Sequence, residues 1–355
     1  MEQHDQLMQA VVYEGPGRLR LRLVPRPKPG PGELLVGIEA CGICGTDLHI
    51  YGGAPGAAPV VAPRILGHEF AGRVQLTGPG VTDFRPGDLV TVDPNDNCGA
   101  CPPCRAGLPH FCTAMRGIGT TVDGAFARYT VVPAKQALQV PDTLDAAAAA
   151  MTEPLACCLH GIDRATIRPG DDVLIIGAGM IGLLMLQLAR LSGAARTAVL
   201  EPQAARRRQA EALGATVVLD PRRPDGSPRS DAELGAAFAV AGIRRFAASI
   251  ECAGQTATME QAFRLCGFAG TVLCFGLTGP DDEMTLRPYD LFSRELTLTA
   301  SYINPATMAR ALDLIAGGRI DVTSMIAGRV TLAGLPDWFR QPAAARNGKY
   351  IVVPG

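Results

Sequence analysis

The sequence of 355 residues lacks long hydrophobic segments. No uninterrupted apolar run reaches the ~18 residues that a membrane-spanning helix needs. The first ten residues, Met1 to Ala10, are too polar to form the apolar core of a secretory signal peptide. We therefore expect a cytoplasmic protein without a membrane partner.

The sequence also has no large excess of positive or negative charge. The chain has 33 Lys and Arg against 34 Asp and Glu, which gives a formal net charge of −1. Such a chain has no long-range attraction for nucleic acid, so a small-molecule partner is the simpler expectation. The densest basic cluster is Arg206–Arg208, which either forms a solvated helix face or belongs to a cofactor site. Charged residues make up only 19% and hydrophobic residues 47%, which indicates compact domains and excludes disorder.

The pattern of apolar residues changes along the chain and indicates two α/β domains. From Gln9 to Val92, short apolar runs are separated by Pro and Gly, which predicts the strands of a β-barrel or sandwich. A helix is expected over Leu144 to Ala165, where alanines precede apolar residues at helical spacing. From Asp171 strands alternate with helices, which predicts a doubly wound parallel sheet. After Tyr302 we expect a helix and closing strands that return to the first domain.

Eleven cysteines in a long chain without a signal peptide point to metal binding rather than disulfides. Four of them form the series Cys98-x2-Cys101-x2-Cys104-x7-Cys112. Thiolates at these short spacings can surround one tetrahedral ion and leave no open position, which describes a structural zinc site. The alternative is a set of unrelated buried thiols, which such spacing in a loop rich in Pro and Gly disfavours.

A dinucleotide-binding pattern follows the first strand of the second half. Gly177, Gly179 and Gly182 form G-x-G-x-x-G and open a helix that includes Met180 and Ile181. The first glycine permits the tight turn, the second lets the backbone approach the pyrophosphate, and the third lets the helix pack on the strand. The pyrophosphate would then face the amides of the helix N-terminus.

The end of the next strand bears on the choice between NAD and NADP. Glu201 lies 19 residues beyond Gly182, where an acidic side chain can bind the ribose hydroxyls and repel a 2′-phosphate. We therefore expect NAD. Arg206 and Arg207 could reach a 2′-phosphate, so NADP stays open as the alternative.

A weaker pattern lies upstream of the four cysteines. The segments CGICGTDLH and LGHEF contain Cys44, His68 and Glu69, whose side chains are all metal ligands. Spacing alone gives this second metal site only moderate support, because isolated His and Cys residues are more often structural.

From about Met8 to Val353 the chain resembles the zinc-containing medium-chain dehydrogenases. The resemblance rests on CGICGTDLHIYGG, GHEFAG and EPLACCLHG, which are most similar to the polyol (sorbitol), threonine and butanediol branches. It implies a GroES-like β-barrel catalytic domain over residues 1–158 and 300–355, and a Rossmann domain over residues 159–299. It also implies two zinc ions per chain, NAD or NADP as cofactor, and a homodimer or homotetramer with an interface near the segment TLTAS.

The resemblance further assigns roles to residues of the weaker pattern. Cys44, His68 and Glu69 would bind the catalytic zinc, and Glu153 would either ligate it or hold its water. Three neighbours of Cys44 match the family's hydroxyl-bearing proton relay, the residue that orients the zinc site by hydrogen bonds, and the histidine that receives the proton: Thr46, Asp47 and His49. For Cys157 and Cys158, a structural role as buried helix residues is favoured over a role at the zinc.

Further cofactor contacts are expected at later strand ends of the Rossmann sheet, since these face the nicotinamide. These residues are Cys252, Phe275, Gly276 and Leu277, and core packing is the alternative for each.

These features predict an enzyme that transfers hydride between a secondary alcohol and NAD, giving a ketone. By analogy the substrate is a polyol, sugar, cyclitol or amino-sugar alcohol, and a threonine-type or butanediol-type enzyme is the alternative. A non-catalytic, zinc-ribbon-like binding protein is a remote alternative. The near-zero net charge and the intact glycine motif argue against it.

Overall fold

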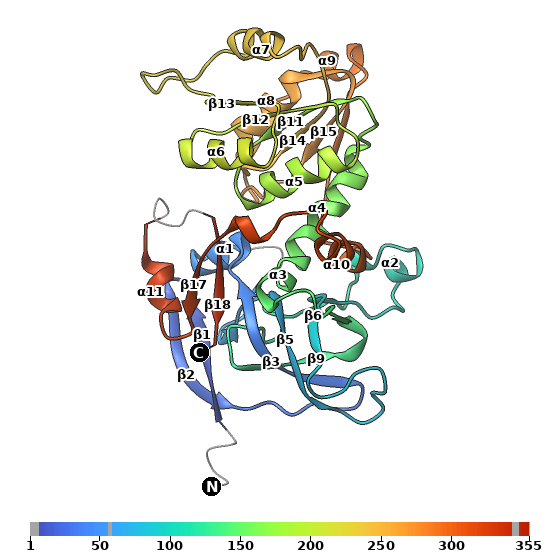
Figure 1. The fold of residues 1–355 in the computed structure, drawn as a ribbon, viewed down its shortest axis with the longest axis vertical. Coiled ribbons are helices and arrows are strands. Elements are labelled where there is room, and N and C mark those ends of the chain that lie inside the picture. The colour runs from blue at the N-terminus through green and yellow to red at the C-terminus, as the bar shows by residue number, and fades with distance from the viewer. Residues whose placement is uncertain (1–6, 56–58, 343–347, 355) are drawn as a thin grey trace. The chain divides into compact units, whose positions relative to one another are not determined.

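The computed structural model describes residues 7–55, 59–342 and 348–354, which form two compact units (Figure 1). One unit consists of Met1–Ala156 with Pro305–Gly355, and the other of Cys157–Asn304. The domain boundaries expected after residues 158 and 299 lie a few residues from the observed ones. The first observed boundary, after Ala156, falls inside a helix. Residues 1–6, part of the segment where no signal peptide is expected, lie outside the described residues.

The first unit is built from antiparallel strands, with one parallel pair near its C-terminal edge. A three-stranded sheet has the order β2-β1-β4, and a seven-stranded sheet has the order β10-β6-β5-β3-β18-β17 with β9 paired to β3. The strands of the small sheet are β1 (Leu7–Gly15), β2 (Arg18–Pro25) and β4 (Arg64–Ile65). Those of the large sheet are β3 (Glu33–Gly42), β5 (Glu69–Thr77), β6 (Leu89–Val92), β9 (Tyr129–Pro133), β10 (Ala137–Gln139), β17 (Ile326–Thr331) and β18 (Lys349–Val353).

Burial explains why distant segments meet in this unit. The central strand β3 is almost entirely buried, as expected for a strand with partners on both sides and apolar residues facing the core. Phe126 packs edge-on against Phe339 of α11 (Leu335–Arg340), with ring centroids 6.4 Å apart. Strand β18 pairs with β3 through Ile351 opposite Gly42. The C-terminal segment is therefore an integral part of the first core.

The second unit is a six-stranded parallel sheet of order β13-β12-β11-β14-β15-β16. Its strands are β11 (Asp172–Ile176), β12 (Arg196–Leu200), β13 (Val217–Leu219), β14 (Phe246–Glu251), β15 (Cys266–Cys274) and β16 (Thr297–Ala300). Its helices are α5 (Met180–Leu191), α6 (Ala204–Ala212), α7 (Asp231–Val240), α8 (Thr256–Leu265) and α9 (Pro288–Ser293). All five residues of β11 are buried, as a strand covered on both faces requires. The order reverses at β11, which confirms the predicted Rossmann sheet.

The prediction of one continuous helix over residues 144–165 is wrong. The structure has two helices, α3 (Ala146–Ala149) and α4 (Thr152–Ala165), with a break at Ala150 and Met151. Pro154 has no N–H to donate to the carbonyl of Ala150, and its ring clashes with a helical turn at that point. The proline is tolerated in the first turn of α4, so the chain starts a new helix there.

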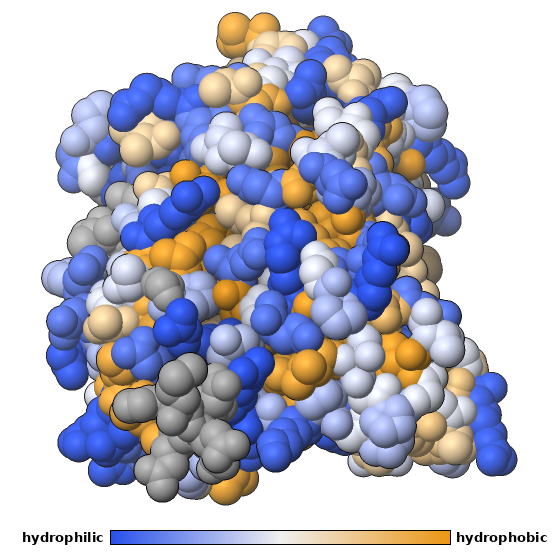
Figure 2. Space-filling model, turned by 60° about the horizontal axis from the view of Figure 1, so that its bottom comes forward, coloured by the Kyte–Doolittle hydropathy of each residue, from blue (hydrophilic) through white to orange (hydrophobic). Residues whose placement is uncertain are grey.

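The remaining α-helices and strands of the first unit are α1 (Gly45–Tyr51), β7 (Asn95–Asp96), α2 (Pro102–Arg105), β8 (Arg116–Gly117) and α10 (Met308–Ala316). None of the helices over the described ranges is long and apolar enough to cross a membrane. On the face shown in Figure 2, hydrophobic side chains lie in separate patches among hydrophilic ones. That mixed surface is ordinary for a folded domain.

Candidate functional site

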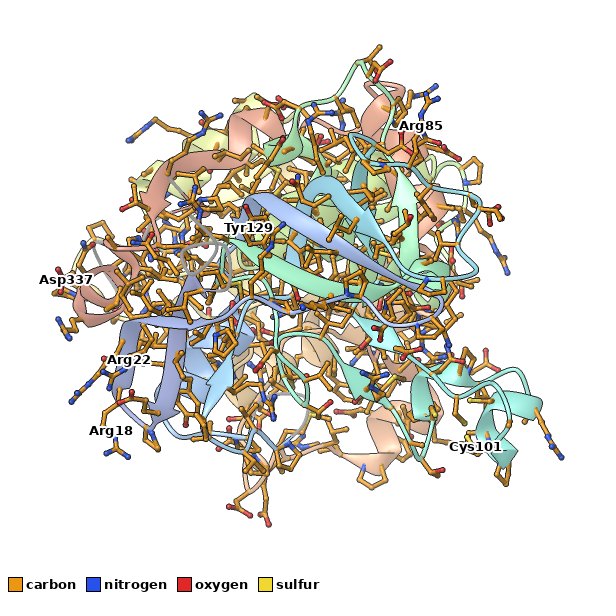
Figure 3. The ribbon with its side chains drawn as sticks, turned by 90° about the horizontal axis from the view of Figure 1, so that it is seen from below. Arg18, Arg22, Arg85, Cys101, Tyr129 and Asp337 are labelled. Atoms are coloured by element: carbon orange, nitrogen blue, oxygen red, sulfur yellow. The ribbon has the colours of Figure 1, made fainter. Side chains whose placement is uncertain are left out.

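The four-cysteine series forms a lobe between β7 and β8. The sulfurs of Cys98, Cys101, Cys104 and Cys112 all lie within 4.8 Å of one another. The Cys101 sulfur is 3.4 Å from that of Cys104 and 3.8 Å from that of Cys112. Figure 3 shows Cys101 in this lobe, which projects beyond the strands of the same unit. The predicted grouping of all four sulfurs is therefore present.

The electrostatics of the lobe suit a divalent cation. Backbone N–H groups of Cys104 and Thr113 lower the pKa of the Cys101 thiol to about 6. Burial and the hydrogen bond with the neighbouring Cys101 sulfur raise the pKa of the Cys104 thiol to about 12. Backbone N–H groups of Cys98 and Ala114 also donate to the Cys112 sulfur, at 3.3 and 3.4 Å. A zinc ion bound by four thiolates would remove their mutual repulsion.

A second group of ligand atoms lies where α1 meets the start of β5. One atom each from Cys44, His68 and Glu69 lies within 4.8 Å of the others. The register of β3 and β5 places Glu69 opposite Gly42, two residues before Cys44, which caps the N-terminus of α1. His68 and Glu69 are buried and Cys44 is half-buried. Sulfur, nitrogen and oxygen donors at this spacing fit a catalytic zinc with a position left for water or substrate.

Asp47 contacts two members of this ligand set and orients them. Its Oδ2 accepts the backbone N–H of Cys44 at 2.9 Å, and its Oδ1 lies 3.6 Å from Nδ1 of His68. Burial opposes charge on His68, but Cys44 and Asp47 outweigh it and raise the pKa of that imidazole well above its usual value. Because Nδ1 faces Asp47, Nε2 is the nitrogen available to a metal ion.

A buried lysine that no sequence motif predicts also contacts this group. Lys349 on β18 donates to the carbonyl oxygen of Ile43 at 3.0 Å and forms an ion pair with Oε2 of Glu69. Both charged side chains are almost fully buried. Lys349 is 280 residues from Glu69, so no local motif could have revealed the pair.

The other residues expected near this zinc are less tightly joined to it. Thr46 is half-buried and His49 is exposed, both on α1. Glu153 is buried in the first turn of α4 and does not belong to the group of three close ligand atoms. Of the two thiols that follow Glu153 on α4, Cys157 is half-buried and Cys158 is buried.

The glycine motif has the geometry that a dinucleotide needs. Gly177 follows β11 with φ +95°, a conformation that favours glycine. A Cβ on Gly182 would overlap the carbonyl oxygen of Gly177, so only glycine lets α5 pack there. At Gly179, by contrast, the nearest atom to an added Cβ is Nη1 of Arg206 at 4.0 Å. This open space at the N-terminus of α5, which begins with Met180 and Ile181, is where a pyrophosphate would lie.

Glu201 and the two arginines are arranged differently from one another. The buried carboxylate of Glu201 accepts the backbone N–H groups of Ala178 and Gln203, both at 2.8 Å. Arg207 is held by Asp220 at 2.8 Å. Arg206 is half-buried and, over the described residues, makes no ion pair or hydrogen bond. Glu201 thus shapes the glycine loop, and Arg206 is the available cation beside it.

The later strand ends lie together at the carboxyl edge of the sheet. Cys252 follows β14 and donates its N–H to the carbonyl of Ile176 at 2.8 Å, beside the glycine motif. Phe275, Gly276 and Leu277 follow β15, the neighbouring strand. Cys252, Phe275 and Gly276 are half-buried, whereas Leu277 is 49% exposed. This is the edge at which parallel sheets bind nucleotides.

A doubly wound sheet with a dinucleotide loop, together with a closed and an open metal-ligand set, defines a zinc-dependent alcohol dehydrogenase that uses NAD(P). The models for the alcohol dehydrogenase GroES-like domain and for zinc-binding dehydrogenases match residues 30–142 and 181–317. The chain belongs to the zinc-dependent medium-chain dehydrogenase family. The predicted family, two-domain fold and cofactor class are thereby confirmed.

Three relatives illustrate the breadth of that family. The chain is 42% identical to a zinc-binding dehydrogenase of Sinorhizobium meliloti solved with NADP, with a TM-score of 0.89 over 98% of this chain and 99% of that one. It is 32% identical to the L-galactonate-5-dehydrogenase of Escherichia coli, over 94% of this chain and 95% of the relative. It is 28% identical to the sorbitol dehydrogenase of Bacillus subtilis, over 98% of each.

Proposed function

We propose that the protein oxidises a secondary hydroxyl group of a polyol, sugar or related polyhydroxylated substrate to a ketone. The observation that carries this is the ligand set Cys44, His68 and Glu69, in which a carboxylate accompanies one thiol and one imidazole. Relatives that act on sorbitol and L-galactonate support the substrate class. The fold by itself does not specify a substrate.

The residues of the first unit divide the work of this reaction. A zinc ion held by Cys44 and His68, with Glu69, would act as a Lewis acid toward the substrate oxygen, and the nicotinamide would accept hydride. Asp47 keeps the imidazole of His68 in its ligating orientation.

We assign proton release to residues of α1, and the orientation of a water molecule at the zinc to a residue of α4. The hydroxyl of Thr46 would accept the proton of the substrate hydroxyl as it releases its own proton toward His49, whose exposed imidazole would take that proton up and return it to solvent. Glu153, buried at the start of α4, is proposed to orient water or to exchange as a ligand.

A substrate panel tests the proposal. Polyols, sugars, cyclitols, amino-sugar alcohols, L-threonine and 2,3-butanediol would each be assayed by the absorbance of the reduced nicotinamide. We expect the highest kcat/KM with a polyhydroxylated compound. Threonine or butanediol as the best substrate would contradict this assignment and leave the dehydrogenase class intact.

We expect kcat/KM to be higher with NAD than with NADP. The buried carboxylate of Glu201 lies at the end of β12, where it disfavours a 2′-phosphate. Arg206 is the available cation, so Arg206→Ala should reduce turnover with NADP more than with NAD. One relative was solved with NADP, so a preference for NADP is the alternative outcome of this assay. That preference would show that attraction of the 2′-phosphate by Arg206 outweighs its repulsion by Glu201.

We also propose that the chain forms a homodimer or homotetramer through β16. This strand is at the edge of the six-stranded sheet, with no further strand beside it in the described parts of the chain. Leu298 on β16 and Phe268 on the neighbouring β15 are exposed by 37% and 65%. Such an edge can pair with a second copy of itself. Light scattering should show an oligomer that Leu298→Lys weakens, and a monomeric wild type would refute the proposal.

We propose a cytoplasmic location on the basis of the free thiols. All eleven cysteines are free thiols, and five of them, Cys44, Cys98, Cys101, Cys104 and Cys112, belong to the two groups of potential metal ligands. Free thiols and thiolate ligands are typical of a reducing compartment such as the cytoplasm.

A further inference from the structure

The carboxyl group of Glu251 lies fully buried at the end of β14 and has no part in the roles assigned so far. Three donors converge on its Oε1. They are the backbone N–H groups of Ala253 and Gly254, at 2.7 and 2.9 Å, and the hydroxyl of Thr258 on α8, at 2.8 Å. The side chain thus ties the loop after β14 to the first turn of the next helix.

The loop held by Glu251 contacts the glycine motif. A Cβ on Gly177 would lie 3.2 Å from the nitrogen of Ala253, so the two turns are in close contact. Cys252 also donates its N–H to Ile176 at 2.8 Å. The position of the loop therefore bears on the turn that must receive the pyrophosphate.

The same glutamate supports the segment after β15. Its carbonyl oxygen accepts the N–H groups of Phe275 and Gly276, both at 3.0 Å. A Cβ on Gly276 would lie 2.6 Å from Oε2 of Glu251, and a Cβ on Gly254 would lie 2.6 Å from the carbonyl oxygen of Leu277. The two loops are packed backbone to backbone with the carboxyl group between them.

We propose that Glu251 is a positioning residue for the nicotinamide cofactor. It fixes two loops, 252–254 and 275–277, against the glycine motif, so that this edge of the sheet is preorganised before the cofactor binds. It does not touch the cofactor itself, because the side chain is fully buried. This inference depends on the cofactor class and not on the proposed substrate.

The charge of the group guides the choice of variant. Burial raises the pKa of Glu251, and its Oε2 has no hydrogen-bond partner among the described residues. The ionisable side chains that face it are the thiols of Cys252 and Cys274, whose pKa values are also raised by burial. Because the three donors converge on Oε1 alone, an amide oxygen can accept them in its place, and glutamine is the conservative replacement.

The test compares Glu251→Ala with Glu251→Gln and with Ile250→Ala, a cavity control one residue earlier on the same buried strand. Titration of NADH by fluorescence, without substrate and well below the thermal midpoint of each variant, gives Kd. We expect Glu251→Ala to raise Kd at least about tenfold, because three donors lose their acceptor. Glu251→Gln should stay within about twofold of the wild type, since its amide oxygen accepts the same donors.

The control separates positioning from stability. Ile250→Ala should lower the thermal midpoint without changing Kd for NADH, since it removes buried volume but no loop hydrogen bond. If Glu251→Ala lowered only the midpoint, or if Ile250→Ala weakened NADH equally, the proposal would be overturned. Should Glu251→Ala fail to fold, Thr258→Val removes one of the three donors and should raise Kd by a smaller factor. An unchanged Kd in that variant would also count against the proposal.

Discussion

Replacing Cys44 with serine should lower turnover more than about 100-fold, since altering residues that merely orient a metal ligand already costs 10–100-fold. The substitution removes the one sulfur among the three close ligand atoms. Zinc content should fall from two ions per chain to one, because the four-cysteine lobe is separate. NADH titration should give an unchanged Kd, since the glycine motif belongs to the other unit.

Cys157→Ser is the matched control for this experiment. Cys157 is half-buried and lies outside both ligand groups. The variant should keep both zinc ions and wild-type turnover. Full activity in Cys44→Ser, or loss of the second zinc from the control, would show that the catalytic ligands are assigned wrongly.

Replacing Lys349 with methionine should destabilise the first unit by about 3–5 kcal/mol, because it leaves the buried carboxylate of Glu69 without its partner. For a unit of this size the thermal midpoint should fall by roughly 10 °C. Differential scanning calorimetry after removal of zinc by a chelator measures the change, since a zinc ion at Glu69 would itself offset the unpaired charge.

The partner substitution identifies the cause of that loss. In Lys349→Met combined with Glu69→Gln no charge is left unpaired, so much of the stability should return even though a metal ligand is altered. Lys349→Arg keeps the charge and should lose less than Lys349→Met. A double variant as unstable as Lys349→Met alone would mean that packing of the lysine stem, and not the ion pair, provides the stability.

The sequence revealed those parts of the site whose geometry is local. The spacing of Cys98, Cys101 and Cys104 brings their sulfurs together within one loop, and the glycine motif acts within one turn. Pro154 also carried a local signal, since its missing N–H breaks the helix that the alanine run predicts.

Other parts depend on contacts that no local pattern encodes. Lys349 reaches Glu69 only because β18 pairs with β3, and β3 in turn pairs with β5. The hydrogen bonds of Glu251 likewise require its strand to end between two loops from different parts of the sequence. Such side chains are interpretable as site residues only once strand order and register are known.

The return of β18 to the first unit has a consequence for synthesis on the ribosome. The nucleotide-binding unit, Cys157–Asn304, is contiguous and can fold as soon as it has emerged. The first unit cannot pair Glu69 with Lys349 until β18 has also emerged, so its metal site is finished after the nucleotide fold although its cysteine and histidine are made first. A nascent chain stalled before β18 would hold a complete nucleotide fold and an incomplete metal site.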